Sequence, residues 1–557
     1  MQVYNKKEKY FKYIEKHSTV FGFLLYLIGL IWFCLLSQDE LNYKTYMSEN
    51  ALLIGQVNEI FGDVSSSVEF YEESKKAFKS NEIIGLKQWL SIQLSTIGLE
   101  VYSQNFSFSH DILSPLKSIN GSNLYGIMRS PSGGRTEALV IITSLGDNPT
   151  YFGSLAYVLS LSKLFRNLFW SELEGRSGSI QAGLSLEFPN LYQSAIDILP
   201  EGPNGLLANL DLVNTVVRLA EAHSVVTRVN SQPYDYRRVT LGTRLNDMMG
   251  LMKAVWNQGS NSPTGLHGPL INYQIPAITL RAEQKHRSTV PRSSEVLSVT
   301  RLLEGILRSI NNLQERFHQS FWYYFLPNPY RYISIGVYMP PVLIMILSLL
   351  LKQLESNSPL YSSATPPYIL CLILRLTLCF STGFLLHSSP KYLFKLSNLL
   401  LIGSQSINST FKLVDIFLIG ITSLIIAVMI VLPILMLIIK KLLNLYEADK
   451  QDLTGQLCLF SWALFLSCLT CLNISSAVVL GIPIVPLLSL FVQRKDNIET
   501  KKIQQQHYPI SVNAVRNCYE KCILQSLIEA DLFGCWTWPV ITCGYTSLWL
   551  LTWLAIF

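Results

Sequence analysis

The sequence lacks cysteine from Gln38 to Leu326, a long stretch with ordinary globular composition. Disulfides within this stretch therefore contribute nothing to its stability, although its length permits a hydrophobic core of its own. A zinc site is not expected near Cys518, Cys522 and Cys535, because their spacing is loose and no histidine completes it. The ten cysteines lie in or after apolar runs, at Cys34, Cys371, Cys379, Cys458, Cys468, Cys471, Cys518, Cys522, Cys535 and Cys543.

Charged residues are also scarce, at 15% of the 557 residues, against 49% hydrophobic residues. The mean hydropathy of +0.29 is too high for a wholly water-soluble protein, yet long polar stretches exclude a bundle of membrane spans alone. The net charge is only +6, and the basic residues cluster beside apolar runs. This pattern argues against a nucleic-acid partner and indicates membrane topology instead.

The N-terminal residues 1–17 form a basic tail, which we expect to be cytosolic. The following run Ser18–Ser37 carries no charge and has the length of a bilayer span. It lacks a small-residue cleavage site after a short apolar core, so it is interpreted as a signal anchor that sends Gln38 and the residues after it across the membrane. The lysines of the tail are Lys6, Lys7, Lys9, Lys12 and Lys16.

Residues 38–331 are predicted to form a lumenal α/β domain with a parallel or mixed sheet, because helical and strand patterns alternate. The sequons at Asn105 and Asn120 are then available for N-glycosylation. Predicted helices are Asn81–Ile97, Tyr151–Phe165, Leu206–Ala222, Thr243–Trp256 and Ser293–Phe325, and predicted strands are Leu99–Phe106, Leu124–Met128, Ala138–Thr143, Ser179–Phe188, Ser224–Val229 and Ile275–Arg281.

The stretch Gln314–Pro341 is predicted to connect this domain to the membrane. Its aromatic residues combine apolar rings with polar atoms, which is typical of the headgroup region of a bilayer. An aromatic core helix is the alternative interpretation. The aromatic residues are Phe321, Trp322, Tyr323, Tyr324, Phe325, Tyr330 and Tyr332.

Residues 332–557 are predicted to form an all-α bundle, giving seven membrane spans in the whole chain, or eight if Leu393–Ile402 inserts. The block Leu453–Val492 is long enough for two spans that turn near Asn473. Basic residues fall on the cytosolic side of most loops, whereas the loop His387–Asp415 is basic and yet carries a lumenal sequon at Asn408. The other apolar runs are Tyr332–Leu351, Pro367–Leu386, Ile416–Ile439 and Phe533–Phe557.

Arg375 lies within one of these spans, where an ionised group is costly unless it is paired or reaches water. One interpretation is contact with an anionic lipid headgroup or an acidic partner. The other is an arginine that snorkels or is paired inside the membrane.

Four stretches resemble the anchor-attachment (Gaa) subunit of the glycosylphosphatidylinositol (GPI) transamidase, in the same order and with the same architecture. They are E-R-F-H-Q-S-F with I-S-I-G-V-Y-M-P-P at the junction, L-E-G-R-S-G-S-I-Q-A-G-L-S-L-E-F, P-E-G-P-N-G-L-L-A-N-L-D-L-V-N and L-H-G-P-L-I-N-Y-Q-I-P-A-I-T-L-R. The resemblance implies a lumenal domain similar to co-catalytic zinc aminopeptidases, and these motifs allow its metal ligands to be checked one by one.

Most of the zinc ligands implied by that resemblance are absent. Glu187 and His267 match two ligand positions, and Asp147 lies near the bridging one, but the H-x-D pair is missing. The short segment Arg166–Leu173 also leaves no room for the strand with the E-E pair. A dinuclear hydrolytic centre needs about five ligands and a base. We therefore interpret the domain as a degenerate peptidase fold without a cofactor, in which Glu187 and His267 are structural. A residual site for a single cation is the alternative interpretation.

The resemblance implies a non-catalytic subunit of the GPI transamidase in the endoplasmic reticulum membrane. A separate caspase-like cysteine subunit would carry out transamidation, and this chain would help to bind the GPI lipid and the proprotein. A proline in the last span of the family is implicated in GPI recognition, and Pro539 is the only match. Its alternative interpretation is a proline in the first turn of the last span. A membrane-anchored metallopeptidase and a lipid transporter are the alternative functions.

Overall fold

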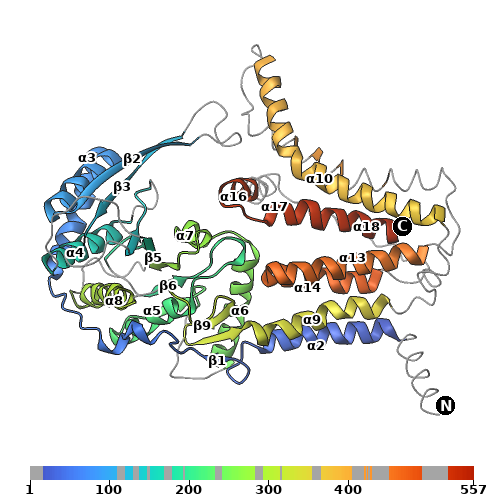
Figure 1. Cartoon of the computed structure of the whole chain (residues 1–557), viewed down its shortest axis with the longest axis horizontal. Helices are drawn as coiled ribbons and strands as arrows, with labels where there is room; N and C mark the ends of the chain where they lie inside the picture. The colour runs from blue at the N-terminus through green and yellow to red at the C-terminus, as the bar shows by residue number, and fades with distance from the viewer. Residues whose placement is uncertain are drawn as a thin grey trace. The chain divides into compact units, whose positions relative to one another are not determined.

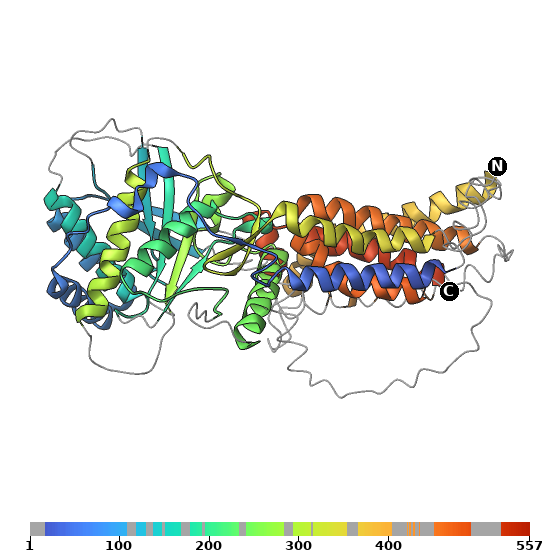
Figure 2. The same cartoon turned by 90° about the horizontal axis from the view of Figure 1, so that it is seen from below.

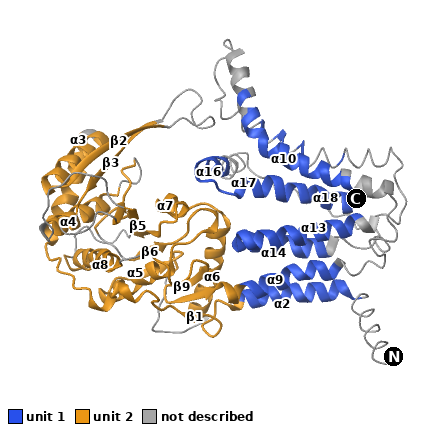
Figure 3. Cartoon of the chain, viewed as in Figure 1, with its two compact units in different colours: residues 1–34, 109–118, 339–557 blue, residues 35–108, 119–338 orange. Residues whose placement is uncertain are grey.

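The chain forms two compact units (Figures 1 and 3), each of which is described separately. Unit 2 comprises residues 35–108 and 119–338, and unit 1 comprises residues 1–34, 109–118 and 339–557. The computed structural model describes residues 17–108, 119–129, 137–146, 151–168, 179–191, 195–232, 241–282, 293–313, 316–353, 366–403, 451–491 and 525–556, with a few positions between 420 and 434.

Unit 2 is built around a mixed five-stranded sheet with the strand order β4-β5-β8-β6-β7. The strands β4, β5 and β8 are parallel, β6 is antiparallel to β8, and β7 is parallel to β6. The mixed α/β architecture that the sequence predicts is therefore confirmed. The strands are β4 (Glu137–Ile142), β5 (Ser179–Glu187), β6 (Ile196–Leu199), β7 (Thr227–Val229) and β8 (Ala277–Ala282).

In the described part of unit 2, six α-helices accompany this sheet: α3 (Val64–Ile97), α4 (Phe152–Leu168), α5 (Leu210–Ala222), α6 (Leu241–Gly259), α7 (Gly268–Asn272) and α8 (Ser293–Asn311). Helices α5 and α8 lie side by side in Figures 1 and 2, and α3 packs against α4. Apolar residues recur along α5 and α8 with helical spacing and are buried in the core with the strands. Burial of these faces supplies most of the driving force for folding.

Residues 42–63 cross unit 2 with little regular structure, and we call this segment the strap. Buried carboxylates satisfy its backbone N–H groups. Asp211 on α5 accepts from the amides of Ser48 and Glu49 at 3.1 and 2.9 Å. Glu304 on α8 accepts from Ile60 and Phe61 at 3.1 and 3.0 Å. These charge-assisted hydrogen bonds replace the ladder that a strand would provide.

A second, three-stranded sheet has the order β1-β10-β9. It joins β1 (Tyr43–Lys44), in the strap, to β10 (Arg331–Ser334) and β9 (Tyr324–Asn328), all antiparallel. The sequence-based helix Ser293–Phe325 is wrong beyond Asn311, where α8 ends. A short apolar run such as Tyr324–Leu326 fits a buried helix or a buried strand equally well. It pairs with the adjacent β10, whose other partner, β1, lies far away in the sequence.

The prediction that the junction aromatics lie at headgroup level is wrong for three of them. Tyr324, Phe325 and Tyr332 are buried on β9 and β10. The hydroxyl of Tyr324 donates to the carbonyl oxygen of Ala208 at 2.8 Å, within the core of unit 2. Among the aromatic residues from Phe321 to Phe325, only Tyr323 has a largely exposed ring.

The other helix and strand predictions in unit 2 are close to the observed elements. The main difference is α3, which begins at Val64 instead of Asn81. Asp63 caps this helix by accepting from the amide of Ser66 at 3.2 Å. Glu82 has a φ of 46°, which interrupts the regular backbone near the predicted start. The predicted strands at 99–106 and 124–128 form an antiparallel hairpin of β2 (Glu100–Phe108) and β3 (Ile119–Ile127).

The described residues of unit 1 are almost entirely helical. Three helices of that part are long and apolar enough to cross a membrane, at Ser18–Leu35, Ile335–Lys352 and Thr454–Leu472, and Ile474–Ser489 is a shorter apolar helix. The elements are α2 (Ser18–Leu35), α9 (Ile335–Gln353), α10 (Pro366–Gly403), α13 (Gln451–Leu472), α14 (Ile474–Phe491), α16 (Gln525–Phe533), α17 (Thr537–Pro539), a π-helical segment (Val540–Thr546) and α18 (Ser547–Ile556).

The predicted turn between two helices near Asn473 is confirmed, because α13 ends at Leu472 and α14 begins at Ile474. The Asn473 side chain accepts from the amide of Ser475 at 3.0 Å and caps α14. The predicted loop from His387 is wrong as far as Gly403, because α10 continues through Pro390. Ser389 donates its hydroxyl to the carbonyl of Leu386 at 2.8 Å, the group that loses its amide partner at Pro390.

Candidate functional site

The carboxyl ends of β5 and β8 bring together the residues that the family resemblance selects in unit 2. Glu187 ends β5 and stands opposite Arg281 in the parallel register with β8. His267 directly precedes α7, and its Nδ1 lies 2.7 Å from Oγ1 of Thr279 on β8. Carboxyl ends of parallel strands are where α/β proteins commonly place their sites.

The Glu187 carboxylate forms an ion pair with Arg281. Nε of Arg281 donates to Oε2 of Glu187 at 2.6 Å, and its Nη2 donates to the carbonyl oxygen of Thr264 at 3.0 Å. The Glu187 side chain is 4% exposed and that of Arg281 is 45% exposed. The guanidinium therefore supplies the positive charge that this buried carboxylate requires.

His267 is fully buried, and burial lowers its pKa to about 4. The neighbouring carbonyl groups of Glu201 and Pro200 oppose this shift, although Nε2 makes no hydrogen bond of standard geometry within the described residues. The imidazole is therefore neutral at neutral pH. A side chain at Gly265 would collide with Thr279, so the loop before His267 depends on a glycine.

Glu201 is a buried acid of this region that the sequence interpretation missed. Oγ1 of Thr264 donates to its Oε2 at 3.0 Å, and burial raises the pKa of Glu201 to about 7. The hydrogen bonds from Thr264 and Asn257 oppose the shift. The only signal in the sequence is an acid between Pro200 and Gly202, at the end of a buried strand.

These residues do not fit a zinc centre. No group of three potential ligands occurs among the residues that the structure describes, and Asp147 lies outside them. The Glu187 carboxylate is paired with Arg281, and Nδ1 of the buried His267 is hydrogen-bonded to Thr279. A hydrolytic zinc site needs three protein ligands and an open position for water. The arrangement is that of a structural polar cluster.

The raised pKa of Glu201 makes its contribution to stability depend on pH. The folded state keeps the Glu201 proton up to about pH 7, whereas an unfolded glutamic acid releases it near pH 4.5. The stability contributed by this proton should therefore fall by up to about 3 kcal/mol as the pH rises from 4.5 through 7, whereas His267, whose pKa burial lowers, contributes in the opposite direction. The effect of Glu201 is then given by the difference between the wild type and a Glu201 variant. Glu201→Gln should remove this loss, because the amide oxygen still accepts from Thr264. Thermal unfolding of the full chain at pH 4.5 and pH 8 measures the difference in melting temperature between the wild type and Glu201→Gln. An equal difference at both pH values would contradict the raised pKa of Glu201.

A further prediction concerns the Arg281–Glu187 pair. Arg281→Met should cost about 1–2 kcal/mol of unfolding free energy, less than a fully buried pair because water reaches half of the arginine. Adding Glu187→Gln should restore most of it, since a buried amide needs no counter-charge. A double-mutant cycle on the full chain measures the coupling, and strictly additive effects would rule out the pairing.

The two residues proposed for lipid contact lie in unit 1. Arg375 on α10 donates through Nη1 to Oγ1 of Thr454 on α13 at 3.4 Å, so the arginine has a hydroxyl partner and remains partly exposed. Pro539 ends α17, in the first turn of the final helical segment. No intrahelical hydrogen bond is lost there, which agrees with the structural alternative for this proline.

The irregularity near Pro539 comes from the π-helical segment Val540–Thr546 that follows it. Nε1 of Trp538 donates to the carbonyl oxygen of His387 at 3.3 Å, and the Thr542 hydroxyl lies 3.4 Å from Nδ1 of His387. At Gly383, an added Cβ would collide with Ser547 and come within 2.7 Å of the Thr542 carbonyl oxygen. The π-helical segment thus packs backbone to backbone against α10, and such segments are frequent at functional sites.

The predicted glycosylation sites Asn105 and Asn120 lie on the β2–β3 hairpin, and both are exposed. Asn105 stands opposite Ser122 and Asn120 opposite Ser107, so each sequon faces the other across the strands. Both line an open hollow of about 500 Å³ beside Lys87. Asn408 lies outside the described residues, as do Cys518 and Cys522.

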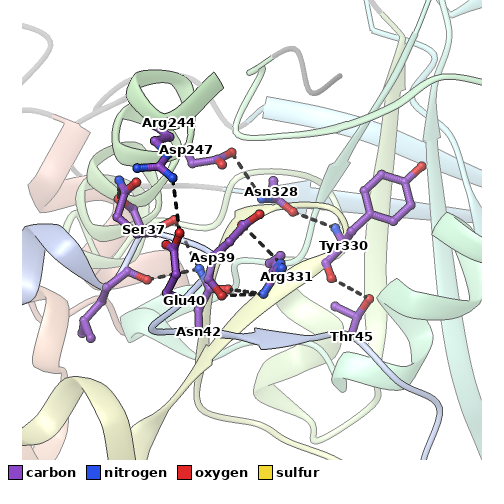
Figure 4. Close-up of polar contacts among 12 residues, drawn as sticks. Ser37, Asp39, Glu40, Asn42, Thr45, Arg244, Asp247, Asn328, Tyr330 and Arg331 are labelled. Carbon is purple, nitrogen blue, oxygen red and sulfur yellow. Dashed lines mark hydrogen bonds and ion pairs between the residues drawn. The ribbon is translucent and has the colours of Figure 1, made fainter. Parts of the chain in front are cut away.

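Polar contacts also connect the first and last residues of unit 2 (Figure 4). Nε of Arg331 lies 3.2 Å from Oδ1 of Asp39, and its Nη1 donates to the Asn42 side chain at 3.1 Å. The Asn328 amide donates to Asp247 on α6 at 3.2 Å, and burial raises the pKa of this carboxyl to about 6. This network fixes α6 next to the strands that lead to α2 and α9.

Comparison with known proteins identifies the family. The profile of the Gaa1-like, GPI transamidase component family matches residues 166–553. Over 384 residues the chain is 30% identical to "GPI transamidase component gaa1" of Schizosaccharomyces pombe, covering 61% of this chain and 64% of that protein. It is 25% identical over 426 residues to "GPI transamidase component GAA1" of Saccharomyces cerevisiae, covering 68% and 65%.

The matched stretch thus spans a little under two thirds of each of these relatives. Among solved structures, a glutaminyl cyclase of Fimbriiglobus ruber aligns at 11% identity and a TM-score of 0.31, over 46% of this chain and 97% of the other. A likeness this low carries no argument about the fold of unit 2. The family profile covers elements of both units, and on that match the chain belongs to the Gaa1-like family of GPI transamidase components.

Proposed function

We propose that this chain is a non-catalytic subunit of the GPI transamidase, which joins GPI anchors to proteins in the endoplasmic reticulum membrane. The observation that carries the proposal is the family match across residues 166–553, which includes β5, β8 and the helices of unit 1. In this role, unit 2 lies in the lumen and the N-terminal tail in the cytosol. The membrane part has seven or eight spans.

The polar cluster at Glu187 supports a non-catalytic role. An activated water or an acyl intermediate requires a metal-bound oxygen or a nucleophile beside a base. Here Arg281 pairs with Glu187, and Thr279 is hydrogen-bonded to Nδ1 of His267. Catalysis is therefore assigned to a separate, caspase-like cysteine subunit. The same pairing argues against a zinc metallopeptidase.

Unit 1 provides the features for holding an anionic glycolipid. Arg375 places a permanent cation within an apolar helix, where a lipid phosphate is a favourable partner. Arg375→Gln is expected to reduce the GPI lipid that co-purifies with the protein by about ten-fold, while Arg375→Lys, which keeps the charge, retains more of it. Equal lipid recovery from all three proteins would remove Arg375 from the binding site.

Affinity purification of the tagged chain in mild detergent tests the proposed function. Mass spectrometry should recover a caspase-like cysteine protease together with other membrane subunits, and a metal assay should give zinc far below one ion per chain. The variant with Glu187→Gln and His267→Gln should contain as little zinc as the wild type. A chain recovered alone with one zinc ion, lost in this variant, would contradict the proposal and favour a peptidase.

A further inference from the structure

Helix α6 of unit 2 carries an apolar stripe that the described residues of this unit leave uncovered. Leu245, Met249, Met252 and Trp256 follow one another at four-, three- and four-residue steps, which places them on one side of the helix. Leu245, Met249 and Trp256 are 51%, 49% and 66% exposed. Soluble surfaces rarely present apolar side chains in such a continuous row, so this stripe requires a partner.

The orientation of α6 is fixed by its opposite face. Leu251 and Ala254 are buried in unit 2. Gly250 lies directly against the carbonyl group of Pro327 on β9, where any side chain would collide. Rotation of the helix would break these contacts, so the stripe cannot turn inward and be covered by the core of its own unit.

The same helix is held close to the points where the chain leaves unit 2. Arg244 donates through Nη2 to Oε1 of Glu40 at 3.2 Å. Glu40 follows Leu35, the last residue of α2, by five residues, and an extended chain spans at most about 18 Å over that length. Asn328, bound to Asp247 of α6, precedes Ile335, where α9 begins, by seven residues. Both α2 and α9 are long and apolar enough to cross a membrane.

The charges of α6 are compatible with the phosphate headgroups of a bilayer. The helix carries only three charged residues, Arg244, Asp247 and Lys253. Asp247 is buried against Asn328, whereas both basic residues are exposed. Helix α6 itself thus contributes two exposed cations and no exposed acid, although Glu40 pairs with Arg244, so Lys253 is the cation left for phosphate headgroups. Tryptophan in particular is enriched at the depth of the headgroups.

We propose that α6 is an interfacial helix that lies in the membrane plane and inserts Leu245, Met249, Met252 and Trp256 at the boundary of headgroups and acyl chains. Unit 2 is then held to the bilayer by this helix as well as by α2 and α9. The occupant of the stripe is lipid and not a second protein. The inference goes beyond the proposed function, since it requires only that α2 and α9 cross a membrane.

Site-specific photo-crosslinking tests the occupant directly. A photoreactive amino acid replaces Met249 in the full chain, which is reconstituted in vesicles of phosphatidylcholine and phosphatidylserine. The matched control carries the same amino acid at Ile92 on α3, which is also apolar and 63% exposed but lies outside the α6 stripe. The proposal predicts on the order of ten-fold more lipid adduct at Met249 than at Ile92.

Equal lipid adducts at the two positions would overturn the proposal, and so would a protein adduct at Met249, whether to a second copy or to another part of the chain. A second variant distinguishes loss of the apolar stripe from misfolding of unit 2. Trp256→Glu should lower the lipid adduct formed from a probe at Leu245 by about five-fold or more, while the thermal midpoint of unit 2 stays unchanged because Trp256 is exposed. Unchanged adduct formation with an intact fold would also contradict insertion of the stripe.

Discussion

Replacing Glu304 by alanine is expected to destabilise unit 2 by about 3–5 kcal/mol, the largest effect of any single substitution proposed for this unit. The carboxylate is fully buried and accepts from the amides of Ile60 and Phe61 and from Nε of Arg308, the last at 2.8 Å. Its loss leaves two N–H groups and a largely buried guanidinium without their acceptor. The strap should then detach near Phe61.

Hydrogen exchange of the full chain, followed by mass spectrometry, measures this detachment at residues 55–65. The control is Glu69→Ala on α3, an exposed glutamate, which should change stability by less than about 0.5 kcal/mol. Protection of Ile60 and Phe61 at the wild-type level in the Glu304→Ala protein would show that the strap is held by other contacts.

Replacing Gly383 by leucine is expected to separate α10 from the π-helical segment of unit 1. The added side chain meets Ser547 and the carbonyl group of Thr542, and neither backbone nor a packed hydroxyl can move away cheaply. Overpacking of this kind costs about 1–3 kcal/mol. It should also break the contact between Trp538 and the His387 carbonyl, and with it the geometry around Pro539.

Gly481→Leu is the matched control, because Gly481 on α14 has nothing within 4 Å of an added Cβ. In detergent, Gly383→Leu should lower the melting temperature of the full chain, and in cells it should reduce attachment of GPI anchors. Gly481→Leu should do neither. Similar behaviour of the two variants would mean that the close approach of α10 to the π-helical segment has no role.

The parts of the fold that follow from local patterns were predictable from the sequence. Alternating or helical periodicity located β5, β8, α5 and α6 to within a few residues, because one face of each element is apolar. The hairpin near Asn473 followed from the length of its apolar block. The strands β9 and β10 did not, because β10 pairs with Tyr43 and Lys44 almost three hundred residues earlier.

The contacts within the polar cluster likewise could not be predicted from local sequence patterns. Motif comparison selected Glu187 and His267, and the structure places Glu187 at the carboxyl end of β5 and His267 beside Thr279 of β8. Their actual partners depend on strand register and loop geometry, which set Arg281 opposite Glu187 and Thr279 beside His267. Glu201 and Glu304 were missed because a buried acid is recognisable only by what surrounds it. The π-helical segment after Pro539 likewise has no local sequence signature.

The central claim is that this chain supports GPI attachment without chemistry of its own. Complementation of cells depleted of their own Gaa1-like protein tests it most directly, with the fraction of a GPI-anchored reporter that keeps its uncleaved C-terminal signal as the readout. The chain with Glu187→Gln and His267→Gln is expected to restore attachment as fully as the wild type at equal protein level. Restoration by the wild type and loss in this variant, with the fold intact, would contradict the claim and assign chemistry to the cluster.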